Sequence, residues 1–126
     1  MKQFCQLVIY AVVLMATAAQ AEFKTFNKSE YDAAMGSGKT VVVDFHASWC
    51  PTCKKQEPVL NEIVRMKGFE NVVAFKADYD QEKDLKKTLN VSKQSTIVVF
   101  KGGKEIGRST GSTAKDELKQ LIEKGL

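Results

Sequence analysis

The segment VVVDFHASWCPTCKKQEPVL, residues 41–60, carries the strongest structural signal in the chain. It begins within a run of β-branched and apolar residues, 40–47, which is typical of a strand buried on both faces of a sheet. Residues 51–67 then place apolar side chains at helical spacing. Cys50 and Cys53 lie at the point where the predicted strand gives way to the predicted helix.

On either side of this segment, strands and helices alternate until a final hairpin. Further strands are predicted at residues 23–26, 72–78, 96–100 and 105–109, and further helices at 29–35, 82–89 and 114–124. Ser29 is predicted to cap the first helix. The order βαβαβαββα requires parallel pairing early in the chain and antiparallel pairing late. The sequence therefore predicts one α/β domain, with a central mixed β-sheet flanked by helices.

Length and composition limit the possible functions. A chain of 126 residues has room for one domain, and 44% hydrophobic with 27% charged residues is ordinary for a globular protein. The net charge is +4, with acidic and basic residues interleaved rather than gathered into a basic stripe. We therefore expect no nucleic-acid-binding surface.

The first 21 residues differ from the rest. Lys2 supplies a positive start, residues 7–15 are uninterruptedly apolar, and residues 19–21 form an A-x-A cleavage signal. The alternative is a membrane anchor, but crossing a bilayer takes roughly 20 apolar residues and this run is about half as long. We expect a signal peptide at 1–21, cleaved near Ala21, and a mature domain at 22–126 in the periplasm or otherwise secreted.

Cys50 and Cys53 are expected to form a reversible disulfide with a chemical role. Cys5 leaves with the signal peptide, so these two are the cysteines of the mature chain. A disulfide that spans two residues closes a very short loop and constrains the unfolded chain little. A cysteine at a helix N-terminus has its thiolate stabilised by free N–H groups and the helix dipole. This predicts Cys50 as the nucleophile and Cys53 as the thiol that resolves the mixed disulfide.

Metal binding is the main alternative for a C-x-x-C pair. A structural zinc site needs four ligands, whereas the mature chain offers two cysteines and His46. We expect no metal, and the absence of a flavin or dinucleotide motif predicts no cofactor. Two alternatives remain open: a dithiol module that binds copper, zinc or an iron–sulfur cluster, and a disulfide donor.

Residues 41–60 resemble the active-site segment of thioredoxins and of periplasmic thioredoxin-like reductases. The similarity continues through IVVFKGGKE, residues 97–105, and through Gly111, so it covers nearly all of the mature chain. A C-x-x-C near a βαβ pattern is itself typical of this family. The resemblance implies a thioredoxin fold and a monomeric protein-disulfide oxidoreductase. It also implies substrates among disulfide-containing exported proteins, and a membrane thiol donor of electrons.

The resemblance also assigns site residues. Asp44 matches the buried acid of the family and Lys76 its lysine partner, both in the catalytic group with the cysteines. Asp44 interrupts an apolar run, and burial raises the pKa of a carboxyl group, which suits a base or proton relay for Cys53. The alternative is a structural ion pair between Asp44 and Lys76. The positions assigned to substrate binding are Trp49, Pro51, Gln94, Ser95 and Gly111.

Two positions depart from the family pattern. The family places a cis-proline where Ser95 stands, opposite the cysteines. A cis bond before a non-proline residue costs about 2.5–4 kcal/mol, so we expect Gln94–Ser95 to be trans, which would shift the strand edge that pairs with substrate. His46 stands where the family usually has a bulky residue, and we expect a packed, hydrogen-bonded side chain rather than a catalyst.

Overall fold

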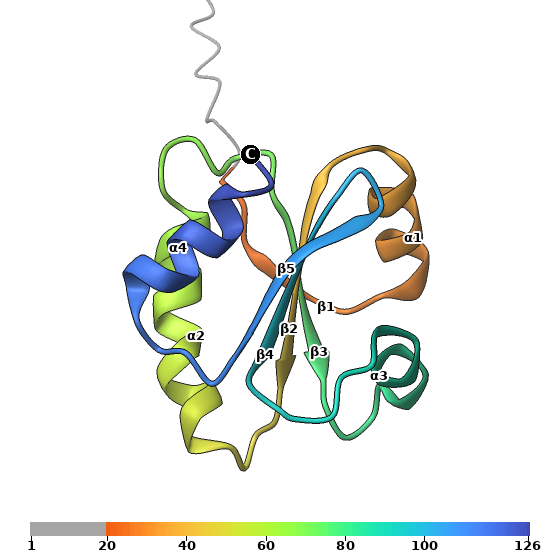
Figure 1. The fold of residues 1–126 in the computed structure, drawn as a ribbon, viewed down its shortest axis with the longest axis vertical. Coiled ribbons are helices and arrows are strands. Elements are labelled where there is room, and N and C mark those ends of the chain that lie inside the picture. Colours follow the sequence, from red (N-terminus) through yellow and green to blue (C-terminus); the bar gives the residue numbers. More distant parts are fainter. Residues whose placement is uncertain (1–19) are drawn as a thin grey trace, which may run out of the picture.

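The computed structural model describes residues 20–126 and has the predicted order of elements (Figure 1). The strands are β1 (Phe23–Thr25), β2 (Thr40–His46), β3 (Val73–Asp78), β4 (Thr96–Lys101) and β5 (Lys104–Thr110). The helices are α1 (Lys28–Gly36), α2 (Pro51–Val64), α3 (Lys83–Leu89) and α4 (Lys115–Glu123). Residues 1–19 of the predicted signal peptide lie outside the described residues. Within residues 20–126, no helix is long and apolar enough to cross a bilayer.

The five strands form one mixed sheet in the order β1-β3-β2-β4-β5. β2 lies at its centre, parallel to β3 and antiparallel to β4, while β5 returns antiparallel to β4 as the predicted hairpin. All residues of β2 are buried except His46, which is half-buried. This central position explains why β2 is a nearly continuous apolar run.

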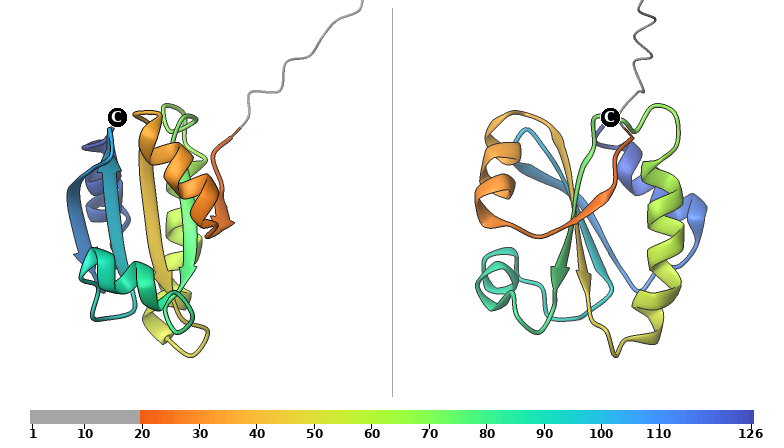
Figure 2. Two further views of the ribbon diagram at one scale, coloured as in Figure 1. Left: turned by 90° about the vertical axis from the view of Figure 1, so that its right-hand side faces the viewer. Right: turned by 180° about the vertical axis from the view of Figure 1, so that it is seen from behind.

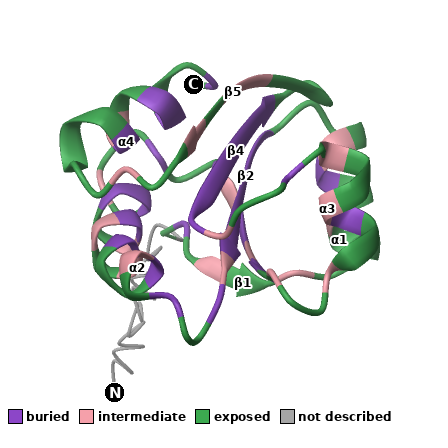
Figure 3. Cartoon of the chain, turned by 60° about the horizontal axis from the view of Figure 1, so that its bottom comes forward, coloured by how far each residue is buried: buried purple, intermediate pink, exposed green. Residues whose placement is uncertain are grey.

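Helices cover both faces of the sheet (Figure 2). α2 and α4 pack on one face over Val42, whereas α1 and α3 pack on the other over Val41, Val43 and Phe45. Buried residues line the sheet-facing sides of these helices (Figure 3). Because side chains alternate along a strand, Asp44 lies on the same face as Val42, beneath α2. The strand alternation therefore brings an acid to the helix that carries the cysteines.

The helix starts were predicted with mixed success. Ser29 is not the cap of α1: the cap is Asn27, whose Oδ1 accepts a hydrogen bond from the Glu30 N–H at 3.0 Å. Pro51 is the first residue of α2, where its missing N–H costs nothing. Cys50 is the N-cap of α2, with an extended backbone. Its side chain is thus directed at the free N–H groups of the first turn.

Candidate active site

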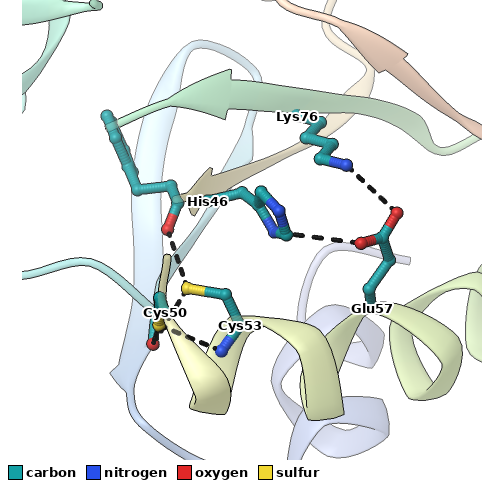
Figure 4. Close-up of polar contacts among 7 residues, drawn as sticks. His46, Cys50, Cys53, Glu57 and Lys76 are labelled. Atoms are coloured by element: carbon teal, nitrogen blue, oxygen red, sulfur yellow. Dashed lines mark hydrogen bonds and ion pairs between the residues drawn. The ribbon is translucent and has the colours of Figure 1, made fainter. Parts of the chain in front are cut away.

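Both cysteines lie at the N-terminus of α2, just beyond the carboxyl end of the central strand β2 (Figure 4). The Cys53 N–H donates a hydrogen bond to Cys50 Sγ at 3.1 Å, as an N-cap side chain accepts it. Both are free thiols in this structure, and each residue is 1% exposed. The predicted Cys50–Cys53 pair is therefore brought together, with Cys50 nearer the helix end.

The environment separates the pKa values of the two thiols. Burial would raise the pKa of Cys50, but hydrogen bonds from the Cys53 thiol, the Ser95 hydroxyl and two backbone amides outweigh it, so that this pKa lies below its ordinary value. Burial and the neighbouring Cys50 raise the pKa of Cys53. As pH rises, Cys50 therefore loses its proton before Cys53 does. This supports the predicted assignment of Cys50 as nucleophile and Cys53 as resolving thiol.

Ser95 lies opposite the cysteines, just before β4. The Gln94–Ser95 bond is trans as predicted, since residues 20–126 contain no cis peptide bond. Ser95 has φ of +64°, in the left-handed region that non-glycine residues seldom adopt. Its N–H donates to Phe45 O at 2.9 Å, and its carbonyl accepts from the Gly111 N–H at 3.0 Å. The backbone of Ser95 is thereby fixed between β2 and the end of β5.

Gln56 is a site residue that the sequence analysis missed. Its side chain is fully buried in α2, and Nε2 donates to Ser95 O at 3.2 Å and to Ser112 O at 2.7 Å. Its Oε1 has no hydrogen-bond partner. The available signal was a polar residue three positions after Cys53, on the face of α2 that carries Leu60. Gln56 connects α2 to the loop that presents Ser95.

Asp44 is buried in β2, 3% exposed, with Oδ1 unpaired. The pKa of Asp44 is raised to about 7. Burial raises this pKa most, the Lys76 ammonium lowers it, and the Glu57 carboxylate raises it. A cavity of about 320 Å³, lined among others by Asp44, Glu57 and Lys76, adjoins the carboxyl group. Asp44 can therefore hold or release a proton near neutral pH.

The alternative interpretation, a structural ion pair between Asp44 and Lys76, is not what the structure shows. The two are register partners on β2 and β3, but Lys76 Nζ lies 3.0 Å from Glu57 Oε1 instead. The second Glu57 oxygen lies 3.9 Å from His46 Nδ1 (Figure 4). Burial and Lys76 lower the pKa of His46, which is therefore neutral at pH 7 and forms no true ion pair. His46 Nδ1 has no hydrogen-bond partner, contrary to expectation.

The predicted substrate-binding residues divide into two groups. Trp49 and Pro51 flank Cys50 in sequence and are exposed, Trp49 at 56%, with its indole N–H donating to Asp80 Oδ2 at 2.8 Å. Ser95 and Gly111 are hydrogen-bonded to one another. Gln94 is half-buried, and no side-chain hydrogen bond positions it. Their part in substrate binding stays a prediction.

The geometry can perform dithiol–disulfide exchange. It combines a thiol of lowered pKa at a helix N-terminus, a second thiol one turn behind, and a buried acid that titrates near neutrality. Within residues 20–126, no three His, Cys, Asp or Glu side chains are grouped as ligands for a metal. The fold and the site define the class of protein-disulfide oxidoreductases.

The comparisons with known proteins agree with this class. The chain matches the thioredoxin family over residues 22–124 and belongs to that family. It is 39% identical to Thioredoxin-2 of Saccharomyces cerevisiae, over 75% of this chain and 88% of the yeast protein. It is 40% identical to Thioredoxin H2-1 of Oryza sativa subsp. japonica over 73% of this chain, but spans only 64% of that protein. The crystal structure of Trxlp from Edwardsiella tarda is similar with a TM-score of 0.78 and 31% identity, covering 80% of this chain and 98% of that chain.

Proposed function

We propose that this protein is an exported reductase, which reduces disulfides of other exported proteins in the periplasm or an equivalent compartment. The observation that carries the proposal is the order of two sequence features. A segment with the composition of a signal peptide, residues 1–21, ends where the match to the thioredoxin family begins, at residue 22.

The chemistry of one dithiol pair requires a partner that supplies electrons. Each turnover leaves Cys50 and Cys53 as a disulfide, and the mature chain has no second cysteine pair to reduce it. Two electrons must therefore come from another thiol protein. In an oxidising compartment outside the cytosol, that source is a thiol donor in the membrane, which brings reducing equivalents across.

Protein substrates are favoured over small disulfides by the surface around Cys50. The Trp49 side chain is exposed beside the cysteine, and an aromatic ring in this position offers apolar contact area at low cost in side-chain entropy. Cys50 itself is only 1% exposed, so a substrate disulfide must approach along this surface. An extended loop of a folded or unfolded exported protein meets that requirement.

Export is tested by expressing the full chain in a Gram-negative host and determining where it accumulates and how it begins. We expect periplasmic protein whose N-terminus is Glu22. Ala21 is 6% exposed and packs on the core beside α4, so cleavage after it has to precede folding. The control is the chain 22–126 preceded by a start methionine, which should stay in the cytoplasm. Cytoplasmic accumulation of the full, uncleaved chain would overturn the proposal.

The substrate class is tested by trapping. A Cys53→Ser variant of the full chain should accumulate mixed disulfides through Cys50, because the resolving thiol is missing. The matched control, Cys50→Ser with Cys53→Ser, should capture nothing. Recovery of exported, disulfide-containing proteins supports a periplasmic reductase, whereas exclusively cytosolic captured proteins contradict it.

A further inference from the structure

The Ser95 hydroxyl lies between the two sulfur atoms of the site. Its Oγ is 3.1 Å from Cys50 Sγ and 3.2 Å from Cys53 Sγ, and the residue is 4% exposed. A serine hydroxyl has one proton to donate, so it can serve as donor to only one sulfur at a time. The two sulfurs are at nearly equal distances, and bond rotation alone can redirect the proton from one to the other.

The surrounding structure holds Ser95 in a backbone conformation that is unfavourable for a serine. Ser95 adopts φ of +64°, and a non-glycine residue remains in that region only when its surroundings impose it. Three contacts do so here: the Ser95 N–H donates to Phe45 O, and the Ser95 carbonyl accepts from the Gly111 N–H and from Gln56 Nε2. Strain of this kind gathers at functional sites.

We propose that Ser95 is a catalytic residue, a single hydroxyl donor that serves the two sulfurs in turn. It donates to the Cys50 thiolate of the reduced protein, and then to the Cys53 thiolate once Cys50 is bound in the mixed disulfide. This inference rests on the dithiol exchange itself and holds wherever the protein acts, so it goes beyond the proposed exported function.

The steps balance without a further reactant. The Cys50 thiolate attacks a substrate disulfide, a Cys50–substrate S–S bond forms, and one substrate sulfur leaves as a thiolate. Cys53 then loses its proton to solvent, with the Asp44 carboxylate as the predicted base, and the leaving thiolate is free to take a proton from solvent. The Cys53 thiolate attacks Cys50 Sγ, the Cys50–Cys53 bond forms, and the second substrate thiolate leaves. Two electrons pass from the protein to the substrate, and the Ser95 proton stays on its oxygen throughout.

Two features explain why a shared donor is useful here. The charge is needed on Cys50 in the first step and on Cys53 in the second, never on both. In the reduced protein the Ser95 hydroxyl acts to lower the pKa of either thiol, in opposition to burial. When Cys50 enters the mixed disulfide its sulfur is neutral and accepts hydrogen bonds only weakly. The hydroxyl is then free to stabilise Cys53 at the moment of attack.

The test uses two variants and a matched control. Ser95→Ala removes the hydroxyl, and Ser95→Gly removes it at a residue for which positive φ is unstrained, so that folding is secured. Ser92→Ala is the control, since Ser92 is exposed in the same loop and its hydroxyl contacts neither sulfur. An aromatic disulfide reagent releases one coloured thiolate on attack by Cys50 and a second on attack by Cys53. Stopped-flow absorbance across pH therefore measures both steps in one experiment.

We expect both Ser95 variants to raise the pKa that governs the first phase, cutting the Cys50 thiolate fraction at neutral pH about ten-fold. We also expect the second phase to slow about ten-fold and to keep that deficit in the glycine variant. Ser92→Ala should match the parent in both phases. A slowed second phase with an unmoved first-phase pKa, or a moved pKa with an unchanged second phase, overturns the shared-donor role. Unchanged kinetics in both variants also overturn it.

Discussion

Two sulfur atoms in one short segment differ in charge because they differ in neighbours. The Cys50 sulfur accepts a backbone N–H at the start of α2, while the Cys53 sulfur faces Phe45 O, an acceptor, at 4.0 Å. A thiolate beside donors is stabilised, and a thiolate beside a carbonyl oxygen is not. The asymmetry of the site therefore begins with main-chain groups, to which the Cys53 thiol and the Ser95 hydroxyl add their hydrogen bonds to Cys50.

Substituting each cysteine separately tests these roles. Cys50→Ser should abolish reduction of insulin disulfides, because the serine hydroxyl is not ionised at neutral pH. Cys53→Ser should still attack once and then remain as a mixed disulfide. Alkylation rates of the two single variants across pH give the thiol pKa values, and a lower pKa for Cys53 than for Cys50 would reverse the assignment.

The charge state of Asp44 should set the pH dependence of resolution. With a pKa of about 7, its carboxylate is available as a base only as pH rises through neutrality. We expect the resolution rate of the parent to rise through that range. Asp44→Asn should resolve more slowly above neutral pH and lose this rise. A rate that does not differ between parent and variant from about pH 6 to pH 9 would leave Asp44 a purely structural role.

The same carboxyl group should also make stability depend on pH. Its pKa is 3.8 in ordinary surroundings and about 7 in the folded chain. Between these two pH values the folded state keeps a proton that the unfolded chain has lost. The contribution of Asp44 to the free energy of unfolding is therefore full below pH 3.8, declines as pH rises, and is gone above about 7. The whole effect is about 4 kcal/mol.

Asp44→Asn, which cannot ionise, should abolish that decline. Urea unfolding should show the variant more stable than the parent by roughly 2–4 kcal/mol above pH 8, and close to the parent near pH 4. Both forms should be measured fully reduced. Equal stability of the two proteins above pH 8 would mean that the folded chain accommodates the Asp44 charge at no cost.

Some of these side chains were predictable and others were not. Asp44 was identified because a carboxyl group within an apolar run demands an explanation. Glu57 was not, because it lies on a helix among other charged residues, and only the packing of α2 over β3 places it on Lys76. Gln56 was missed for a similar reason: its burial depends on how α2 is rotated against the loops at Ser95 and Ser112.

Among the elements, α2 determines how strongly the protein oxidises or reduces. Pro51 occupies its first position and leaves the N–H of Thr52 free to lower the pKa of Cys50, together with the N–H of Cys53. Stabilising the thiolate stabilises the reduced form and makes the disulfide more oxidising. The order of the two residues between the cysteines thus has a measurable consequence.

We predict a reduction potential above the approximately −270 mV of thioredoxin and well below the approximately −120 mV of a dedicated oxidase. Exchanging the intervening pair, Pro51→Gly with Thr52→Pro, removes the N–H at residue 52 and should lower the potential. Lys55→Gln, an exposed change on the same helix, is the control. Equilibration in glutathione buffers measures all three proteins. A parent potential at or below that of thioredoxin would contradict the prediction.

Element order and type followed from sequence pattern, because β2 and β4 are continuous apolar runs and α4 is strongly amphipathic. Helix ends were harder. Asn27 and Ser29 are both good caps, and the choice between them depends on where β1 ends and the chain turns. The conformation of Ser95 was also beyond the pattern, because hydrogen bonds to β2 and to Gly111 impose it.

As a whole molecule, the protein should be a monomer. Among residues 20–126 the large apolar side chains that are well exposed are Trp49 and Leu126, which do not form a continuous patch. A stable interface buries roughly 1,200–2,000 Å², mostly around an apolar centre. Light scattering of the reduced and oxidised protein should give the mass of one chain. If a dimer is found and Trp49→Ala dissociates it, the surface beside Cys50 would be a self-association site.

Both described chain ends lie at the end of the sheet opposite the cysteines, as Figures 1 and 2 show. A tether attached at residue 20 or at Leu126 therefore leaves the end of the domain that carries the dithiol facing away from the support. The protein can be grafted by either end to an electrode or a resin without blocking the reacting sulfurs. The same orientation would present Cys50 to the surrounding solution if a lipid-embedded leader held the domain at a membrane surface.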